Sequence, residues 1–373
     1  MLIYFNNYSS GYRIVSFSRC RESAEYFREH GFDYVSFDGS NAVLYPDNTH
    51  LEFNERSAEK LDMCNDFDVL EISPQGVAYQ YYNAESDDNA FVVTGKCNSN
   101  CVMCPSPESQ RRNSGTYSAD TLIEIARHIP SDAVHFTITG GEPFLMGKEI
   151  FRFLEYIRNN FTDTTVLLLT NGRIFCSAEY CNLLKKTIPQ NTILGIPLHG
   201  YSPETHDLVT QAPGSFSQTL AGIKNLIRLG LSIELRIVVS QITAAYTDKM
   251  AKLIVREIPG VSCVKIMAME MLGNAAVNKD KVWISYTEAF RSTRNLVRRL
   301  VEHGIDTAFY NFPLCTVDRD MWSICSKSIS DYKIRFLPQC DECSVKDACG
   351  GIFAGTVRLE KKDIIPVTGG LAK

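Results

Sequence analysis

The sequence lacks several features that would fix its location or its partners. No apolar run approaches the ~20 residues that a helix needs to cross a bilayer. Residues 1–7 have neither the basic start nor the cleavage site of a secretory signal, and internal repeats and low-complexity segments are missing. We therefore expect a cytoplasmic protein with no membrane partner.

An excess of positive charge is missing as well. The 373 residues include 38 Lys and Arg against 43 Asp and Glu, which gives a formal net charge of −5. We find neither a basic patch interleaved with aromatic residues nor an RNA-binding appendage, so no nucleic-acid partner is expected. Hydrophobic residues make up 45% and charged residues 22% of the chain, as in an ordinary globular protein.

Cysteine, in contrast, is abundant, and its number is odd. Thirteen cysteines without an export signal fit reduced thiols and metal ligands better than a disulfide framework. Cys97, Cys101 and Cys104 have the spacing C-x3-C-x2-C, for which chance would give roughly 0.016 matches in such a chain. Three thiolates can hold three irons of a [4Fe–4S] cluster and leave the fourth iron open to a small molecule. Zinc is the weaker alternative, because structural zinc usually takes four Cys or His ligands.

Strand-like and helix-like segments alternate from Phe91 onward. Expected strands cover residues 91–94, 134–139, 166–170, 192–198, 233–239 and 263–269, and expected helices cover 119–129, 148–161, 178–186, 216–229, 246–258 and 287–303. Six such units predict an α/β fold, a partial (β/α)6 barrel of TIM type with a parallel sheet and helices outside. Functional loops should gather at the carboxyl ends of the strands, and an open side could admit a large substrate.

The two ends of the chain differ from this central part. Residues 1–89 contain β-like runs at 12–17, 34–37 and 76–82 and helix-like stretches at 21–30 and 54–64, which predicts a small α+β accessory domain. Residues 90–304 would form the barrel. Residues 305–373 lose the alternation and become rich in cysteine, so we expect a second metal-bearing module there.

A glycine-rich turn follows the second expected strand. Gly140 and Gly141 let the backbone approach a ligand closely, and Pro143 stiffens the turn after Glu142. Taken alone, such a turn is more often a plain strand-to-helix connection. Its position one strand after the cysteine loop favours a ligand site, where outward carbonyl groups would suit an ammonium group.

The cysteine loop and this turn together resemble the radical S-adenosylmethionine (SAM) superfamily. The resemblance implies that Cys97, Cys101 and Cys104 hold a [4Fe–4S] cluster whose open iron binds SAM. The bound SAM would be cleaved reductively to methionine and a 5′-deoxyadenosyl radical, which takes a hydrogen atom from the substrate. It also implies that the Gly140–Pro143 turn meets the SAM amino group. Met103 stands where the superfamily usually has an aromatic residue close to adenine.

Further contacts to SAM follow from the same resemblance, each beside a plainer alternative. Thr170 and Asn171 would lie near the ribose, although an ordinary Asn-Gly turn explains them equally well. Arg236 would meet the SAM carboxylate. An Arg in so apolar a strand needs an anionic partner, and an internal ion pair with Glu142 or Glu270 would supply one too.

Two histidines follow the fourth expected strand. His199 and His206, the latter followed by Asp207, could line the substrate cavity. A solvated loop histidine is the default interpretation.

A second cysteine motif lies near the carboxyl terminus. Cys340, Cys343 and Cys349 have the spacing C-x2-C-x5-C before two glycines and resemble the auxiliary iron–sulfur motif of SPASM and twitch modules. Cys315 is the expected fourth ligand of a second [4Fe–4S] cluster, with Cys325 as the alternative. A zinc ribbon is another possible interpretation of this segment. The remaining cysteines are expected to be small buried hydrophobic residues: Cys20, Cys64, Cys176, Cys181 and Cys263.

Several segments narrow the resemblance to the maturase of the His-Xaa-Ser system: 88–91, 94–101, 313–315, 328–333 and 349–353. It implies modification of a ribosomally made precursor peptide, with an external reductant such as flavodoxin or ferredoxin and a second radical SAM protein as partners. From their position and size alone, we expect residues 1–89 to hold the leader segment of the precursor. The alternatives are an enzyme acting on a small molecule or a glycyl-radical partner, and a non-catalytic zinc or iron–sulfur scaffold. No catalytic acid or base is evident.

Overall fold

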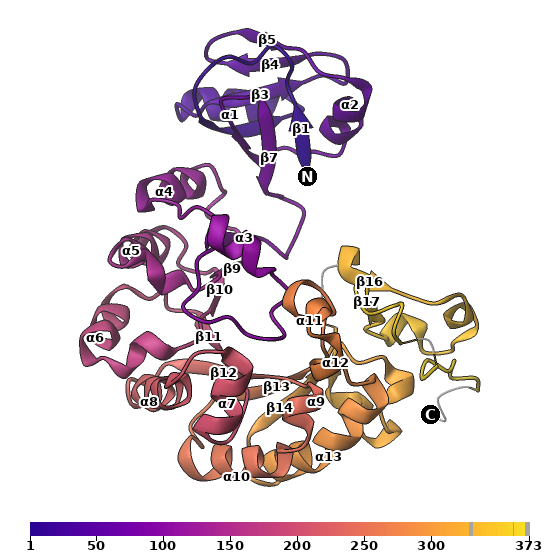
Figure 1. Cartoon of the computed structure of the whole chain (residues 1–373). Helices are drawn as coiled ribbons and strands as arrows, with labels where there is room; N and C mark the ends of the chain where they lie inside the picture. Colours follow the sequence, from indigo (N-terminus) through magenta and orange to yellow (C-terminus); the bar gives the residue numbers. More distant parts are fainter. Residues whose placement is uncertain (328–330, 361, 370–373) are drawn as a thin grey trace.

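The computed structural model describes residues 1–327, 331–360 and 362–369. Residues 328–330, which belong to one of the segments cited above, lie outside the described residues. The described strands form a seven-stranded, an eight-stranded and a two-stranded sheet, which follow one another along the chain (Figure 1).

The seven-stranded sheet forms the amino-terminal part of the molecule. Its order is β1-β7-β6-β2-β3-β4-β5, and every pair is antiparallel except β2 with β3. Helix α1 buries Phe27 and helix α2 buries Leu61, which gives the predicted α+β character. The sequence analysis did not predict strands β1, β4, β5 and β6. The elements are β1 (Leu2–Tyr4), β2 (Arg13–Ser18), α1 (Arg21–Glu29), β3 (Tyr34–Phe37), β4 (Ala42–Tyr45), β5 (Thr49–Leu51), α2 (Glu55–Asp62), β6 (Val69–Ile72) and β7 (Val77–Tyr82).

The eight-stranded sheet runs in the order β15-β14-β13-β12-β11-β10-β9-β8, and all of its pairs are parallel. The partial barrel is therefore confirmed, but it has two more strands than predicted and continues past residue 304. Within the described residues β8 and β15 do not pair, so the barrel is open. Its strands are β8 (Ala90–Thr94), β9 (His135–Gly140), β10 (Thr165–Leu169), β11 (Thr192–Pro197), β12 (Ser232–Val238), β13 (Cys263–Met267), β14 (Asp306–Tyr310) and β15 (Cys325–Ser326).

Helices cover the outside of this sheet (Figure 1). Alternate strand residues such as Phe136 and Ile138 pack against the helices, where α5 buries Phe153, Leu154 and Ile157. The outer helices are α4 (Ala119–Arg127), α5 (Glu149–Asn160), α6 (Ala178–Thr187), α8 (Ser215–Arg228), α10 (Thr247–Glu257) and α13 (Tyr286–Glu302). Shorter helices are α3 (Glu108–Asn113), α7 (Pro203–Thr210), α9 (Gln241–Ala244), α11 (Gly273–Val277) and α12 (Lys279–Val282).

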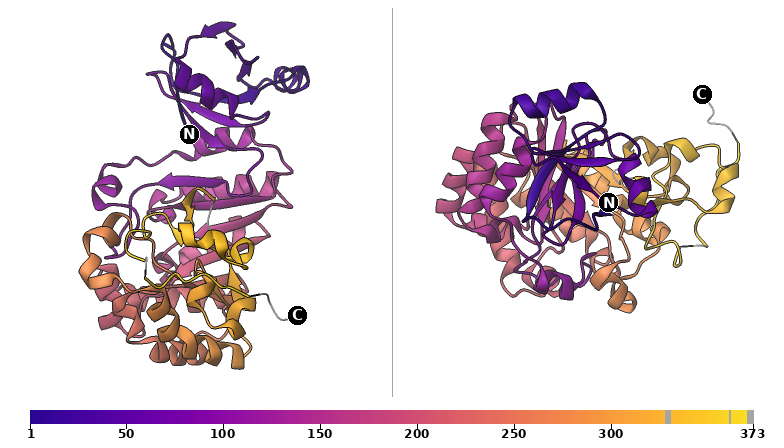
Figure 2. Two further views of the ribbon diagram at one scale, coloured as in Figure 1. Left: turned by 90° about the vertical axis from the view of Figure 1, so that its right-hand side faces the viewer. Right: turned by 90° about the horizontal axis from the view of Figure 1, so that it is seen from above.

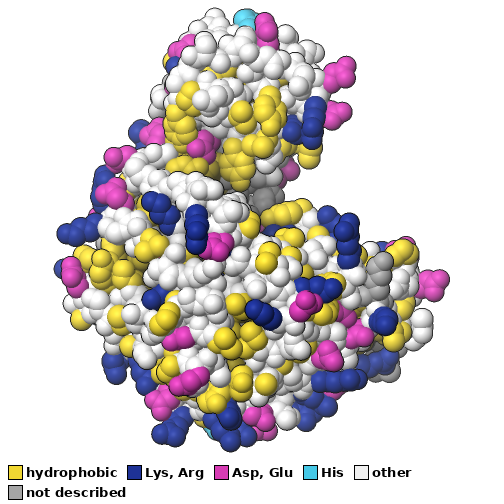
Figure 3. All heavy atoms as spheres, viewed as in Figure 1, with side chains coloured by type: hydrophobic (Ala, Val, Ile, Leu, Met, Phe, Trp, Pro, Cys, Tyr) yellow, Lys and Arg dark blue, Asp and Glu magenta, His cyan; other side chains and the backbone are white. Residues whose placement is uncertain are grey.

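The two outer parts of the molecule pack on the barrel (Figure 3). The buried Ser16 hydroxyl and His128 Nδ1 are 2.8 Å apart, and the Tyr117 hydroxyl donates to Glu71 of β6. The carboxyl-terminal part consists of short turns and the two-stranded sheet of β16 (Ile334–Arg335) and β17 (Ile352–Phe353). It lies to one side of the barrel in the right view of Figure 2. None of the described helices is long and apolar enough to cross a membrane.

Candidate active site

The cysteine loop leaves the carboxyl end of β8, as predicted, and ends at α3. Main-chain hydrogen bonds of 2.9 Å from Asn100 to Thr210 and from Val102 to Val209 fasten it to the end of α7. Cys97, Cys101 and Cys104 are all half-buried free thiols on this loop. The loop is thus held in place by the barrel and not only by its own sequence.

The glycine turn after β9 lies directly against the cysteine loop. The Gly141 N–H donates to Thr94 O and the Glu142 N–H donates to Lys96 O, both over 2.8 Å. A β-carbon at Gly140 would lie 2.2 Å from Thr94 O, and one at Gly141 equally close to Lys96 O. Both glycines are therefore required for the two loops to meet, whatever else they contact.

The Glu142 side chain links this turn to the next strand. It is 2% exposed, and its carboxylate accepts hydrogen bonds from Thr170 Oγ1 (2.8 Å), the Asn171 N–H (2.7 Å) and the Phe144 N–H (3.3 Å). Burial raises the pKa of this carboxyl, and these hydrogen bonds oppose the rise. Glu142 thus joins the turn to the end of β10, where Thr170 and Asn171 were predicted to lie.

The residues after β10 bond back to the cysteine loop. Asn171 Nδ2 donates to Asn98 Oδ1 over 2.6 Å, and Arg173 donates to Asn98 O and Ser99 Oγ over 2.7 and 3.1 Å. The ends of β8, β9 and β10 therefore form one hydrogen-bonded unit around the three cysteines.

A second support of the cysteine loop was not predicted. Asn274 Nδ2 donates to Asn100 Oδ1 and Cys101 O, both over 2.9 Å, and Asn278 Nδ2 donates to Val102 O over 3.0 Å. The two asparagines are four residues apart, Asn274 within α11 and Asn278 directly after it, which places them on one side of this helical segment. That i,i+4 spacing was the available signal, but it does not show which loop the pair would reach.

The protonation of the cysteines depends on what they bind. Burial and the neighbouring thiols raise the pKa of Cys101 to about 12, and burial also raises that of Cys97. Cysteines ligate iron as thiolates, so a bound cation must displace the thiol protons. The three thiols of one loop, without a nearby His, fit the corner of an iron–sulfur cluster. In the described part of the chain no three His, Cys, Asp or Glu side chains form a ready site for a single metal ion.

The structure corrects the predicted partner of Arg236. Its Nε lies 3.1 Å from Oε1 of Glu234, two residues away on the same face of β12, and not beside Glu142 or Glu270. Glu270 instead faces Lys333, 3.9 Å away. The Arg236 side chain is 20% exposed and extends beside Gly195 on the inner face of the sheet.

Met103 lies in a small apolar cluster. It is 5% exposed and packs with Val209, Met269 and Met271. The cluster gives the cysteine loop an apolar inner wall.

The two histidines after β11 are buried, so the prediction of solvated loop residues is wrong. His199 is 5% and His206 is 2% exposed, and burial lowers their pKa values to about 3 and about 4. Both are therefore neutral at pH 7. The His199 N–H donates to His206 Nδ1, and Asp207 bonds main-chain N–H groups of Gly214 and Phe216. These contacts support α7 and α8.

The second cysteine motif also comes together in space. Cys315, Cys340, Cys343 and Cys349 line one small cavity, whereas Cys325 is not among its lining residues. Cys349 Sγ accepts from the N–H groups of Leu314 and Gly351, and Cys343 Sγ accepts from that of Val367, each over 3.4 Å. Cys325 Sγ instead donates to Met321 O over 3.5 Å.

The prediction that the other five cysteines are buried is only partly right. Cys64 and Cys181 are buried, but Cys20 and Cys176 are exposed. Cys263 is half-buried, because it lies on the inner face of β13, where its neighbours are polar.

Comparison with known proteins identifies the central part of the chain. Residues 91–254 match the family model described as "Radical SAM superfamily". These residues form a radical SAM region. The model covers the first five strands of the barrel, including the cysteine loop and the Gly140–Pro143 turn, which confirms the resemblance at this level.

Two curated relatives share part of this radical SAM region. The "AdoMet-dependent heme synthase" of Methanosarcina barkeri is 29% identical over 153 residues, which are 41% of this chain and 42% of the relative. The "Antilisterial bacteriocin subtilosin biosynthesis protein AlbA" of Bacillus subtilis is 34% identical over 147 residues, 38% and 31% of the two chains. The chain thus matches less than half the length of either relative.

One solved structure shows a shared fold. Streptococcus suis SuiB bound to S-adenosylmethionine superposes with a TM-score of 0.50 at 11% identity, over 61% of this chain and 51% of that one.

Proposed function

We propose that this radical SAM protein is an enzyme that cleaves SAM reductively in order to modify a ribosomally made peptide, in the manner of a His-Xaa-Ser system maturase. The observation that carries the proposal is the bonded unit of the cysteine loop and the Gly140–Glu142 turn at the carboxyl ends of β8 and β9. When bound, a [4Fe–4S] cluster with an open iron supplies the electron that splits SAM into methionine and a 5′-deoxyadenosyl radical.

In this proposal each part of the bonded unit has a role. Cys97, Cys101 and Cys104 hold the cluster, and the Gly140–Pro143 turn offers main-chain groups to the SAM amino group. Pro143 begins the short helical turn 143–146 and fixes the direction of the chain after Glu142. Glu142 keeps the turn and the end of β10 together through its three hydrogen bonds.

The remaining SAM contacts come from the inner face of the barrel. Thr170 and Asn171 lie beside the turn and would position the ribose, and the Met103 cluster would shield adenine from water. Arg236 would meet the SAM carboxylate. Among the described residues one carboxylate, 3.1 Å away, balances its charge, so a second anion could share it.

The second cysteine group would hold an auxiliary [4Fe–4S] cluster. Cys315 is the proposed fourth ligand, since it lines the same cavity as Cys340, Cys343 and Cys349. Main-chain N–H groups directed at sulfur stabilise thiolates. Cys325 lacks this environment, because its thiol donates to a carbonyl group.

Three observations support a peptide as the substrate. The barrel is open beside β8, so an extended chain could enter there. A cavity of about 570 Å³ at this opening is lined by uncharged residues only, which does not suit a phosphate or a carboxylate-rich small molecule. The Bacillus subtilis relative is named for bacteriocin biosynthesis. An external reductant such as flavodoxin or ferredoxin and a second radical SAM protein are the proposed partners.

Co-expression with a precursor peptide that contains His-Xaa-Ser repeats tests the proposal. We expect mass spectrometry to show a mass change in the peptide with the native enzyme and none with Cys101→Ala. An unchanged peptide from cells whose enzyme cleaves SAM would exclude the peptide as substrate and leave the radical SAM chemistry standing.

A further inference from the structure

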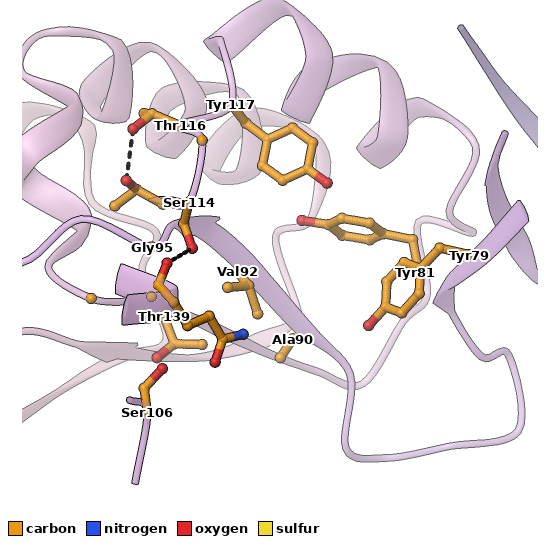
Figure 4. Close-up of a pocket in the computed structure, with 15 residues that line it drawn as sticks. Tyr79, Tyr81, Ala90, Val92, Gly95, Ser106, Ser114, Thr116, Tyr117 and Thr139 are labelled. Atoms are coloured by element: carbon orange, nitrogen blue, oxygen red, sulfur yellow. Dashed lines mark hydrogen bonds between the residues drawn. The ribbon is translucent and has the colours of Figure 1, made fainter. Parts of the chain in front are cut away.

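A cavity joins the amino-terminal sheet to the mouth of the barrel. Tyr79 and Tyr81 of β7 form one side of it, and Ala90, Val92 and Thr94 of β8 form the other (Figure 4). These three β8 residues alternate with Phe91 and Val93, which are buried in the core, so they face the interior of the barrel. Gly140 and Gly141 of the proposed SAM-binding turn also line the cavity.

The lining of this cavity has a uniform chemistry. None of the fifteen residues that line it carries a charge. Its walls combine aromatic rings with hydroxyl and amide groups, and Val92 exposes 50% of its surface there. Such a lining suits an uncharged group that is partly apolar and offers hydrogen-bond acceptors, such as a short stretch of peptide.

Among the residues that line the cavity, Tyr81 has a buried hydroxyl without a hydrogen-bond partner in the described part of the chain. The ring is held by three others: Phe91 at 5.6 Å, Tyr117 at 6.1 Å and Tyr79 at 6.3 Å between centroids. Figure 4 shows the hydroxyl pointing into the space between Tyr117 and Val92.

The hydroxyl groups of two neighbouring tyrosines, in contrast, have a hydrogen-bond partner. The Tyr117 and Tyr12 hydroxyls both donate to the Glu71 carboxylate, over 2.8 and 2.9 Å. A buried hydroxyl without a partner is unfavourable, so its presence beside two hydrogen-bonded tyrosines points to a ligand that supplies the missing partner.

We propose that Tyr81 is a substrate-binding residue in the cavity beside the Gly140–Gly141 turn. Its hydroxyl donates a hydrogen bond to an uncharged acceptor of the peptide, such as a main-chain carbonyl group. This inference rests on the proposed function, in which the substrate is a peptide. The amino-terminal domain then supplies one wall of the substrate site. This role differs from holding a leader segment, because it acts on the part of the peptide that lies next to the chemistry.

Peptide affinity of the full, anaerobically reconstituted chain tests this proposal. The probe is a fluorescein-labelled synthetic peptide of four His-Ala-Ser repeats, and its Kd is measured by anisotropy in the presence of SAM. We expect Tyr81→Phe to raise the Kd about 5–10-fold, as for one lost hydrogen bond, without a lower melting temperature. Tyr26→Phe makes the same chemical change on α1, outside the cavity, and should bind like the native chain.

A second variant fills the cavity from the barrel side. Val92→Phe adds bulk to a half-exposed position and should weaken binding at least tenfold. Equal Kd values for the native chain and Tyr81→Phe would overturn the proposal, and so would native affinity in Val92→Phe. A native chain that forms 5′-deoxyadenosine but does not bind the peptide would overturn it as well. A native chain that forms no 5′-deoxyadenosine would instead refute the proposed function.

Discussion

Replacing Gly141 by alanine should separate the glycine turn from the cysteine loop. The added β-carbon would lie 2.2 Å from Lys96 O, while ordinary contact begins at 3.4 Å, so the two segments must move apart by about 1.2 Å. The hydrogen bonds from Gly141 to Thr94 and from Glu142 to Lys96, now 2.8 Å, would lengthen to about 4 Å and break. Two lost bonds at ~1 kcal/mol each and overpacking of ~1–3 kcal/mol lower the free energy of unfolding by about 3–5 kcal/mol.

The assay combines urea unfolding with iron analysis after anaerobic reconstitution. We expect the native chain to hold about eight irons, four for each proposed cluster, and Gly141→Ala to hold about four. Gly115→Ala is the matched control, because a β-carbon there meets nothing within 4 Å. Native iron content and native stability in Gly141→Ala would refute the reasoning that the two loops form one unit.

Three further predictions follow from single residues. Cys315→Ala should lower the iron content to about four per chain, whereas Cys325→Ala should not, and the reverse result would exchange their roles. Arg236→Met should weaken SAM binding at least tenfold by calorimetry while both clusters remain, and unchanged affinity would remove Arg236 from the SAM site. Burial raises the pKa of Glu360 to about 7, so its neutral form favours the fold. Its contribution is complete below the ordinary carboxyl pKa and is lost as the pH rises through 7. The melting temperature of Glu360→Gln should therefore match that of the native chain at pH 4 and exceed it at pH 8. An equal difference in melting temperature at both pH values would contradict this.

The local pattern of the sequence was sufficient to predict the parallel sheet and the position of the cysteine loop. Strand β10, for example, is a nearly continuous apolar run, and the C-x3-C-x2-C spacing places its residues on one loop. The open barrel and its order followed from the alternation of strands and helices.

The remaining features depend on contacts between distant segments. The Asn274 contact with Cys101 spans 173 residues, and the burial of His199 and His206 results from the packing of α7 and α8. Arg236 and Glu234, in contrast, lie two residues apart on one strand, so strand periodicity could have predicted that ion pair. To predict the cavity wall formed by Tyr79 and Tyr81, one must know the position of β7 relative to β8, which no single segment of the sequence shows.

Electron paramagnetic resonance of the reduced protein tests the open iron most directly. In a Cys340→Ala, Cys343→Ala variant, which should lose the auxiliary cluster, the spectrum would report only on Cys97, Cys101 and Cys104. We predict a cluster signal that changes when SAM is added and that disappears in Cys101→Ala. A signal indifferent to SAM, or zinc bound to these three cysteines in place of iron, would contradict the account.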